Sequence, residues 1–266
     1  MKNAQSYHEI EFPLLRKLVI DSSRLARKKS AIYGLVEFDI TETIKKIRQY
    51  RIRTKSPLSL TAYIIFCIGK AVEARKEVHG YLSRNDKLVC FDDVDLCLFI
   101  EMKIDEHNIP IAHILRSVNK RSFQDIEREI RKVKDGGVSD PETRQQLNQL
   151  RRFFHLPSFV RRIIYYFILR NPHRFKKKMG TVAVTAVGMF GKGSGWGVGL
   201  LNHTLEIVIG GNSVKPVIIK GKIKKREILS VTIAMDHDII DGAPGVRFTQ
   251  GLKDLVEKGY GLEDDT

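Results

Sequence analysis

Side chains that could do chemistry gather in one segment near the end of the chain. Residues 230–257 read SVTIAMDHDIIDGAPGVRFTQGLKDLVE: an apolar strand pattern, then His237, Asp241 and Gly242, then a helical pattern. A neutral imidazole is well suited to accept a proton near pH 7. A histidine at a strand end is held by a rigid element and faces a cleft. His237 is therefore a candidate general base, and Asp241 lies close enough to fix the local turn.

The elements that must position this segment are read from apolar periodicity and from glycine and proline breaks. Long 3.6-residue patterns predict helices, with Ser59 or Thr61 as the N-cap of the most apolar one. Together the patterns predict an α/β fold with a large mixed sheet and helices on one face. The expected helices are 14–29, 41–54, 58–78, 122–134 and 244–258; the expected strands are 32–41, 87–91, 95–104, 109–116, one opening at 180, 204–211 and 215–237, the last with a hairpin near Lys220–Gly221.

The order of strand, His-x-x-x-Asp-Gly and helix resembles the catalytic motif of the dihydrolipoyl acyltransferases, the core subunits of 2-oxoacid dehydrogenase complexes. The chloramphenicol acetyltransferases share its His, Asp and Gly. GTVAVTAVGMFG (180–191) resembles the glycine-bounded strand of those cores, and residues 204–237 resemble the next strand and the final hairpin. The resemblance covers about residues 10–140 and 179–258.

The resemblance implies a two-layer α/β sandwich with a mixed sheet, like that of chloramphenicol acetyltransferase. It also implies one acyltransferase catalytic domain over residues 1–266, with a basic, apolar insertion at about 150–179. The implied activity is coenzyme A-dependent transfer of an acyl group to a thiol or hydroxyl acceptor. The alternative is a catalytically degenerate trimeric scaffold or interaction protein of the same fold.

The resemblance assigns roles to three residues. His237 would deprotonate the attacking thiol of coenzyme A or of a dihydrolipoyl group, Thr185 would donate a hydrogen bond to the oxyanion, and Asp241 would hold the loop. Coenzyme A or acyl-coenzyme A is then a substrate, and no metal is required. Gly188 and Trp196, in a glycine-rich segment, are weaker candidates for cofactor binding. That segment matches no phosphate-binding motif, so it is interpreted as a loop beside the site, in which Trp196 lines a channel or simply packs.

The sequence departs from the family pattern in ways that bear on its partners. It contains no lipoyl domain, so a lipoyl group would have to arrive on a separate protein, or the acceptor is something else. Asp238 stands where the family commonly has arginine, and residues 202–204 read Asn-His-Thr in place of Asn-Pro-Pro. The resemblance implies a homotrimer with active sites between subunits, and the polar end KGYGLEDDT predicts that trimers do not assemble further.

Charge marks out the insertion. The chain has 46 Lys and Arg against 31 Asp and Glu, a net charge of +15. Residues 151–178 hold nine of these basic residues and no acidic one. Three interpretations stay open: the segment binds an anionic membrane surface, covers the active-site mouth against an acyl chain or coenzyme A phosphates, or packs as a structural helix on the trimer. A specific nucleic-acid complex is not expected, because no binding module is present.

The remaining features point to the cytoplasm, with peripheral attachment to a membrane as the alternative. No apolar signal segment opens the chain, and no run of 18 apolar residues occurs. The three cysteines, Cys67, Cys90 and Cys97, are expected to be buried free thiols rather than disulfide partners or zinc ligands.

Overall fold

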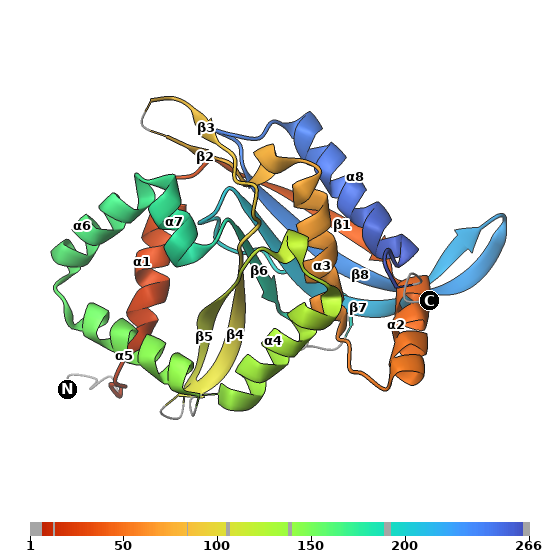
Figure 1. The fold of residues 1–266 in the computed structure, drawn as a ribbon, viewed down its shortest axis with the longest axis horizontal. Helices are drawn as coiled ribbons and strands as arrows, with labels where there is room; N and C mark the ends of the chain where they lie inside the picture. The colour runs from red at the N-terminus through yellow and green to blue at the C-terminus, as the bar shows by residue number, and fades with distance from the viewer. Residues whose placement is uncertain are drawn as a thin grey trace, which may run out of the picture.

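The computed structural model describes residues 7–12, 14–83, 85–104, 107–137, 140–188 and 193–262. Within these residues a six-stranded mixed sheet runs in the order β1-β8-β7-β6-β4-β5 (Figure 1). β6 is parallel to β4 and β7, and the other pairs are antiparallel. The strands are β1 (Ala31–Asp39), β4 (Leu96–Ile104), β5 (His107–Leu115), β6 (Val182–Ala186), β7 (Leu205–Ile219) and β8 (Lys222–Asp236), and a small ribbon pairs β2 (Tyr81–Leu82) with β3 (Leu88–Val89).

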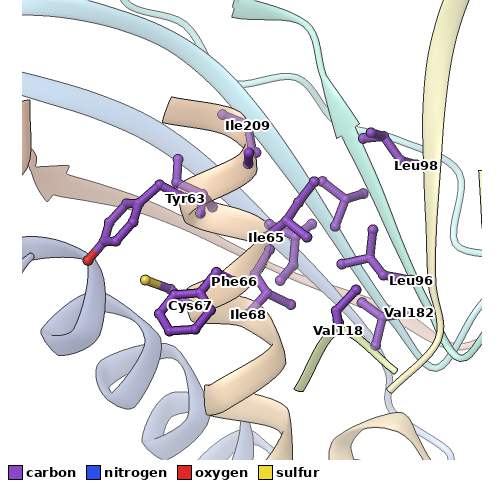
Figure 2. Packing of buried hydrophobic residues seen from close by; sticks show 14 of the residues in the cluster. Tyr63, Ile65, Phe66, Cys67, Ile68, Leu96, Leu98, Val118, Val182 and Ile209 are labelled. Atoms are coloured by element: carbon purple, nitrogen blue, oxygen red, sulfur yellow. The ribbon is translucent and has the colours of Figure 1, made fainter. Parts of the chain in front are cut away.

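Helices cover one face of the sheet, as the apolar patterns predicted. They are α2 (Thr41–Thr54), α3 (Leu60–Glu73), α4 (Phe123–Gly136) and α8 (Gly242–Lys258). α3 is almost wholly buried, and Ser59 is its N-cap, since the Ser59 hydroxyl accepts from the Ala62 N–H at 3.1 Å. Figure 2 shows Ile65 and Ile68 directed at the strands, whereas Tyr63 points toward the helical layer.

A second group of helices gathers on one side of the molecule (Figure 1). It consists of α1 (Lys17–Ala26), preceded by the short helix η1 (Leu14–Arg16), and of α5 (Pro141–His155), α6 (Ser158–Leu169) and α7 (Pro172–Met179). The predicted insertion is therefore helical along most of its length. In the part of the chain that the structure describes, no helix is both long enough and apolar enough to cross a membrane.

Several predicted elements need correction. β7 is one 15-residue strand with an irregularity between Ile209 and Asn212, not two strands, because two glycines let the backbone bulge without interrupting the pairing. α3 is shorter than predicted, and α5 and α7 were not predicted as helices. The pattern at 87–91 gives only the two residues of β3. Cys90 is exposed, whereas Cys67 and Cys97 are buried.

Glycines allow three backbone segments to pack in direct contact with one another. A Cβ atom added to Gly188 would lie 1.9 Å from the Gly210 carbonyl oxygen, and one added to Gly210 would lie 2.3 Å from the Gly195 carbonyl oxygen. Gly195 also forms an isolated bridge with Gly211. The end of β6, the bulge of β7 and the glycine-rich loop therefore pack together only because side chains are absent there.

Replacing Gly188 with alanine is expected to destabilise the fold. The new Cβ cannot be accommodated without moving backbone, which costs typically about 1–3 kcal/mol. Gly251→Ala is the matched control, because Gly251 lies in α8 with nothing within 4 Å of its added Cβ. That variant should gain up to about 1 kcal/mol from helix propensity. The free energy of unfolding in urea measures both changes, and equal values would refute the packing argument.

A buried histidine anchors the start of β6. The Nδ1 atom of His79 lies 2.9 Å from the Thr181 hydroxyl, and Nε2 donates to the Phe91 carbonyl at 3.1 Å. His79 is fully buried, and this burial lowers its pKa from 6.5 to about 4. The imidazole is therefore neutral near pH 7, and its role is structural.

Stability should depend on pH through His79. Because the folded pKa lies below the ordinary value, the unfolded chain binds a proton first as the pH falls. The contribution of His79 is complete above about pH 6.5 and is lost toward pH 4, with a slope of up to about 1.4 kcal/mol per pH unit. Urea unfolding across this range, compared with His79→Gln, isolates the contribution. Equal slopes for the two proteins would show that His79 does not cause the loss.

Candidate functional site

His237 is the first residue after β8 and lies at the surface of the chain. The register of β8 is fixed on both sides, by β1 and by β7, so the strand end is held rigidly. The His237 N–H donates to the Ser30 carbonyl at 2.8 Å, which attaches the turn to the segment before β1. The His237 side chain is exposed and makes no hydrogen bond with the described residues. Its imidazole is thus available to an incoming group.

The turn that carries His237 is organised by the residue before it. Asp236 is buried, and its carboxylate lies 2.5 Å from the Lys29 ammonium group. The Asp236 carbonyl accepts from the N–H groups of Ile239 and Ile240, at 3.0 and 2.9 Å. Its carboxylate also faces the Asp238 N–H at 3.4 Å. An aspartate that precedes a tight turn is the sequence signal that could have indicated this role.

Asp241 does not show the loop-holding contacts predicted for it. It occupies the N-cap position of α8 with extended backbone, but its side chain caps no N–H group. Asp241 is exposed, and within the described residues no hydrogen bond joins it to His237. Asp236 holds the turn instead. Its backbone carbonyl and its carboxylate both accept hydrogen bonds from N–H groups of the loop.

Thr185 lies in the middle of the sheet. It pairs with Phe99 of β4 and with Val208 of β7. Its neighbours Val182 and Val184 belong to the core beneath the helices, so the alternation of the strand puts Thr185 on the opposite, outer face. The side chain is half-buried, and its hydroxyl has no hydrogen-bond partner among the described residues. The hydroxyl can therefore donate to a substrate that reaches this face.

The glycine-rich loop lies over this outer face. A Cβ on Gly197 or Gly199 would come within 4 Å of Val208, the partner of Thr185. Trp196 donates from Nε1 to the Val36 carbonyl at 3.1 Å, although 40% of the residue stays exposed. The structure therefore gives Trp196 and Gly188 packing roles. Contact of either with a cofactor stays a prediction, and residues 189–192 lie outside the described part of the chain.

The register separates His237 from Thr185 within one chain. Thr185 is level with Val208 and, through it, with Thr232 on β8. His237 lies five residues beyond Thr232, which is roughly 17 Å along a strand. β7 lies between β6 and β8, so these two strands are two inter-strand spacings apart, about 10 Å across the sheet. A single subunit therefore does not bring His237 and Thr185 together.

Two other histidines are engaged in contacts, and two of the three cysteines are buried. His203 contacts the Met179 carbonyl at 2.8 Å, and His113 lies 2.7 Å from the Glu129 carboxylate. Burial raises the pKa of the Cys67 and Cys97 thiols to about 12, so both are protonated near pH 7. Among the described residues, no three His, Cys, Asp or Glu side chains form a group that could hold a metal ion.

Comparison with known proteins points to one family. Residues 172–262 match the family model of the 2-oxoacid dehydrogenases acyltransferase catalytic domain. The succinyltransferase component of the 2-oxoglutarate dehydrogenase complex of Bos taurus mitochondria is 32% identical over 80 residues, which are 29% of this chain and 17% of that protein. The corresponding component of Rickettsia typhi is 21% identical over 96% of this chain and 56% of that protein. The chain thus spans little more than half the length of these relatives at most.

Solved structures share the fold over nearly the whole chain. A probable dihydrolipoamide acetyltransferase from Listeria monocytogenes superposes with a TM-score of 0.72 at 17% identity, covering 99% of both chains. The dihydrolipoamide acetyltransferase of Azotobacter vinelandii gives 0.73 at 14% identity, covering 98% of this chain and 96% of that chain. A chloramphenicol acetyltransferase gives 0.52 at 13% identity, covering 89% and 94%.

These likenesses confirm the predicted two-layer fold of the chloramphenicol acetyltransferase type. They extend over the described strands and helices that carry His237 and Thr185, whereas the sequence match is concentrated in the last third of the chain. Residues 172–262, which include His237, Asp241 and Thr185, match the model of the 2-oxoacid dehydrogenases acyltransferase catalytic domain, and nearly the whole chain shares the fold of the solved cores.

Proposed function

We propose that this protein is a coenzyme A-dependent acyltransferase that uses His237 as its general base. The observation that carries the proposal is an exposed histidine without a hydrogen-bonded side-chain partner among the described residues, held on a rigid strand end by Asp236. This histidine lies in the segment that matches the acyltransferase family. Coenzyme A or its acyl thioester is the proposed substrate, and the acceptor is a thiol or hydroxyl group.

The spacing of the proposed residues supports the assignment. In the A. vinelandii acetyltransferase, the residues investigated for a role in the catalytic mechanism are a serine, a histidine 52 positions later and an asparagine four positions after that. Thr185, His237 and Asp241 have the same spacing. Threonine keeps the hydroxyl of serine, whereas the aspartate is a charged replacement for asparagine.

The chemistry follows from the properties of thiols. A free thiol has a pKa near 8.5, so a base is needed to form the thiolate at neutral pH. His237 takes the thiol proton, and the thiolate attacks the carbonyl carbon of the acyl group. The Thr185 hydroxyl donates a hydrogen bond to the resulting oxyanion. Collapse of the intermediate breaks the bond to the leaving thiolate or alkoxide, which takes the proton back from His237.

Acyl transfer between an acyl-coenzyme A and a small thiol should test both roles. His237→Ala is expected to lower kcat by about 10²–10⁴-fold, because the base is lost. Thr185→Val keeps the shape of the side chain and should lower kcat by about 10²–10³-fold, because the donor is lost. Equal turnover by wild type and His237→Ala would overturn the assignment of the base. No turnover by wild type, with dihydrolipoamide or a separately supplied lipoyl domain as acceptor, would favour the scaffold alternative.

The separation of the two residues supports a homotrimer with each site formed between subunits. In one chain they are well beyond hydrogen-bond reach of a common substrate atom, so the proposed site combines His237 of one subunit with Thr185 of another. Figure 1 shows the tip of the β7–β8 hairpin projecting from the body. Val214, Ile218 and Ile223 on this tip are 63–76% exposed, which is typical of a surface that a second subunit covers.

Mixing two inactive variants should restore activity if the sites are shared. Trimers containing both His237→Ala and Thr185→Val subunits have some interfaces at which an intact His237 meets an intact Thr185. Random assembly gives this arrangement at about a quarter of the interfaces of a cyclic oligomer. Co-expression followed by an acyl-transfer assay measures the restored fraction.

The hairpin supplies the control. Ile218→Asp combined with Ile223→Asp in both variants is expected to shift the molecular mass from trimer to monomer and to abolish the restoration. Restoration by monomers, or no restoration by well-formed mixed trimers, would contradict sites shared between subunits.

A further inference from the structure

A groove between α1 and α6 is separate from the proposed catalytic residues. It has a volume of about 700 Å³, within the range of small-molecule sites. Its apolar walls come from Leu25 of α1 and from the α6 residues Ile163, Tyr165, Tyr166, Phe167 and Leu169. Four of these five α6 side chains are between 37% and 53% exposed, so the groove presents apolar surface to solvent.

α6 exposes several large apolar side chains that an ordinary surface helix would bury. The buried residue of α6 among those described is Arg161, whose Nε lies 2.8 Å from the buried Asp21 carboxylate of α1. The guanidinium also lies 5.6 Å from the centre of the Phe154 ring. This buried ion pair fixes the rotation of α6 and thereby leaves Ile163 and Phe167 exposed. The exposed apolar face is thus a consequence of specific packing.

Basic side chains surround the apolar walls. Arg24 comes from α1 and Lys28 from the turn after it, whereas Arg162 comes from α6 and Arg170 is the C-cap of that helix. Asp21 is the acidic residue that lines the groove, and it is already paired with Arg161. A second copy of this surface would bring like charges together, since residues 151–178 hold nine basic residues and no acidic one. The charge pattern therefore fits an anionic occupant with an apolar body.

One end of the groove lies close to the loop of His237. Lys28 lines the groove, and the next residue, Lys29, binds the Asp236 carboxylate. Ser30 then accepts the hydrogen bond of the His237 N–H. An occupant of the groove would therefore lie near the proposed base without depending on its chemistry.

From these contacts we infer that the groove binds a single-chain anionic amphiphile. The alkyl chain of the amphiphile packs against Leu25 and the apolar side chains of α6. Its phosphate or carboxylate head lies among the four basic residues. A free amphiphile and a lipid in a bilayer share this chemistry, and the concave walls favour the free molecule. The inference goes beyond the proposed function, because binding does not require acyl transfer.

Calorimetric titration of the full-length protein with dodecyl phosphate, below its micelle concentration, tests the inference. Dodecyl maltoside has the chain without the charge, and butyl phosphate has the charge with a short chain. Dodecyl phosphate should bind at least about tenfold more tightly than either. His237→Ala should bind it as wild type does, so failed catalysis and failed binding are distinguishable.

Two double variants test separately the apolar walls of the groove and its rim, the four surrounding basic residues. Ile163→Ser with Phe167→Ser should weaken binding of both dodecyl compounds, whereas Arg162→Gln with Arg170→Gln should remove the preference for the phosphate. Ile52→Ser with Arg53→Gln, an exposed pair on α2, is the matched control and should bind as wild type does. Circular dichroism confirms that each variant is folded.

Three outcomes would overturn the inference. They are similar affinity for all three compounds, unchanged binding by the wall and rim variants, and no binding at all. Sedimentation with vesicles of phosphatidylcholine and phosphatidylglycerol tests whether the groove binds a membrane surface and not a free amphiphile. If wild type sediments with these vesicles, the wall variant does not, and monomeric dodecyl phosphate does not bind, the face is a membrane-binding surface and not a ligand groove.

Discussion

The arrangement of the functional region depends on the pairing of one buried carboxylate, that of Asp236. A carboxylate without a partner in this position would carry a large desolvation cost, so the ammonium group of Lys29 must stay beside it. This pairing fixes the end of β8 against the segment between α1 and β1. The hydrogen bond from His237 to Ser30 adds a second attachment at the same place. The direction of the His237 turn is thereby set by a buried charge and not by the exposed Asp241.

A second buried ion pair of this kind involves helix α1. Asp21 of α1 is buried and meets the buried guanidinium of Arg161, as Lys29 just beyond α1 meets Asp236. Breaking either pair would leave a buried charge without its partner, which is strongly destabilising. α1 therefore links the helices of the insertion to the His237 loop. A ligand that moved α6 would act on the loop through this connection.

The two faces of the sheet differ in composition and in what covers them. One face is apolar and is covered by α2, α3, α4 and α8, so it supplies most of the core. The outer face carries small and polar residues, among them Thr185 and Thr232, beneath a loop whose glycines permit close approach. The hydroxyl of Thr232 is buried without a hydrogen-bond partner among the described residues. Such a face is well suited to a substrate passage, because it offers donors without bulk.

The sequence by itself determined the fold class and the candidate residues. Local signals sufficed for these: the apolar periodicity of α3, the cap at Ser59, the hairpin near Gly221, and His237 between a strand and a helix. It did not predict the continuity of β7, because the glycines of its bulge resemble a break in a linear pattern.

Tertiary structure decided the rest, for reasons of distance and pairing. The partners of Asp236 and Arg161 lie 207 and 140 residues away along the chain, so no local pattern reveals them. For the same reason the rotation of α6 could not be read from its sequence, which left its role open between surface, cover and structural helix. The separation of Thr185 from His237 follows from the register of three strands. Register is a property of the assembled sheet, and it underlies the proposal that a second subunit completes the site.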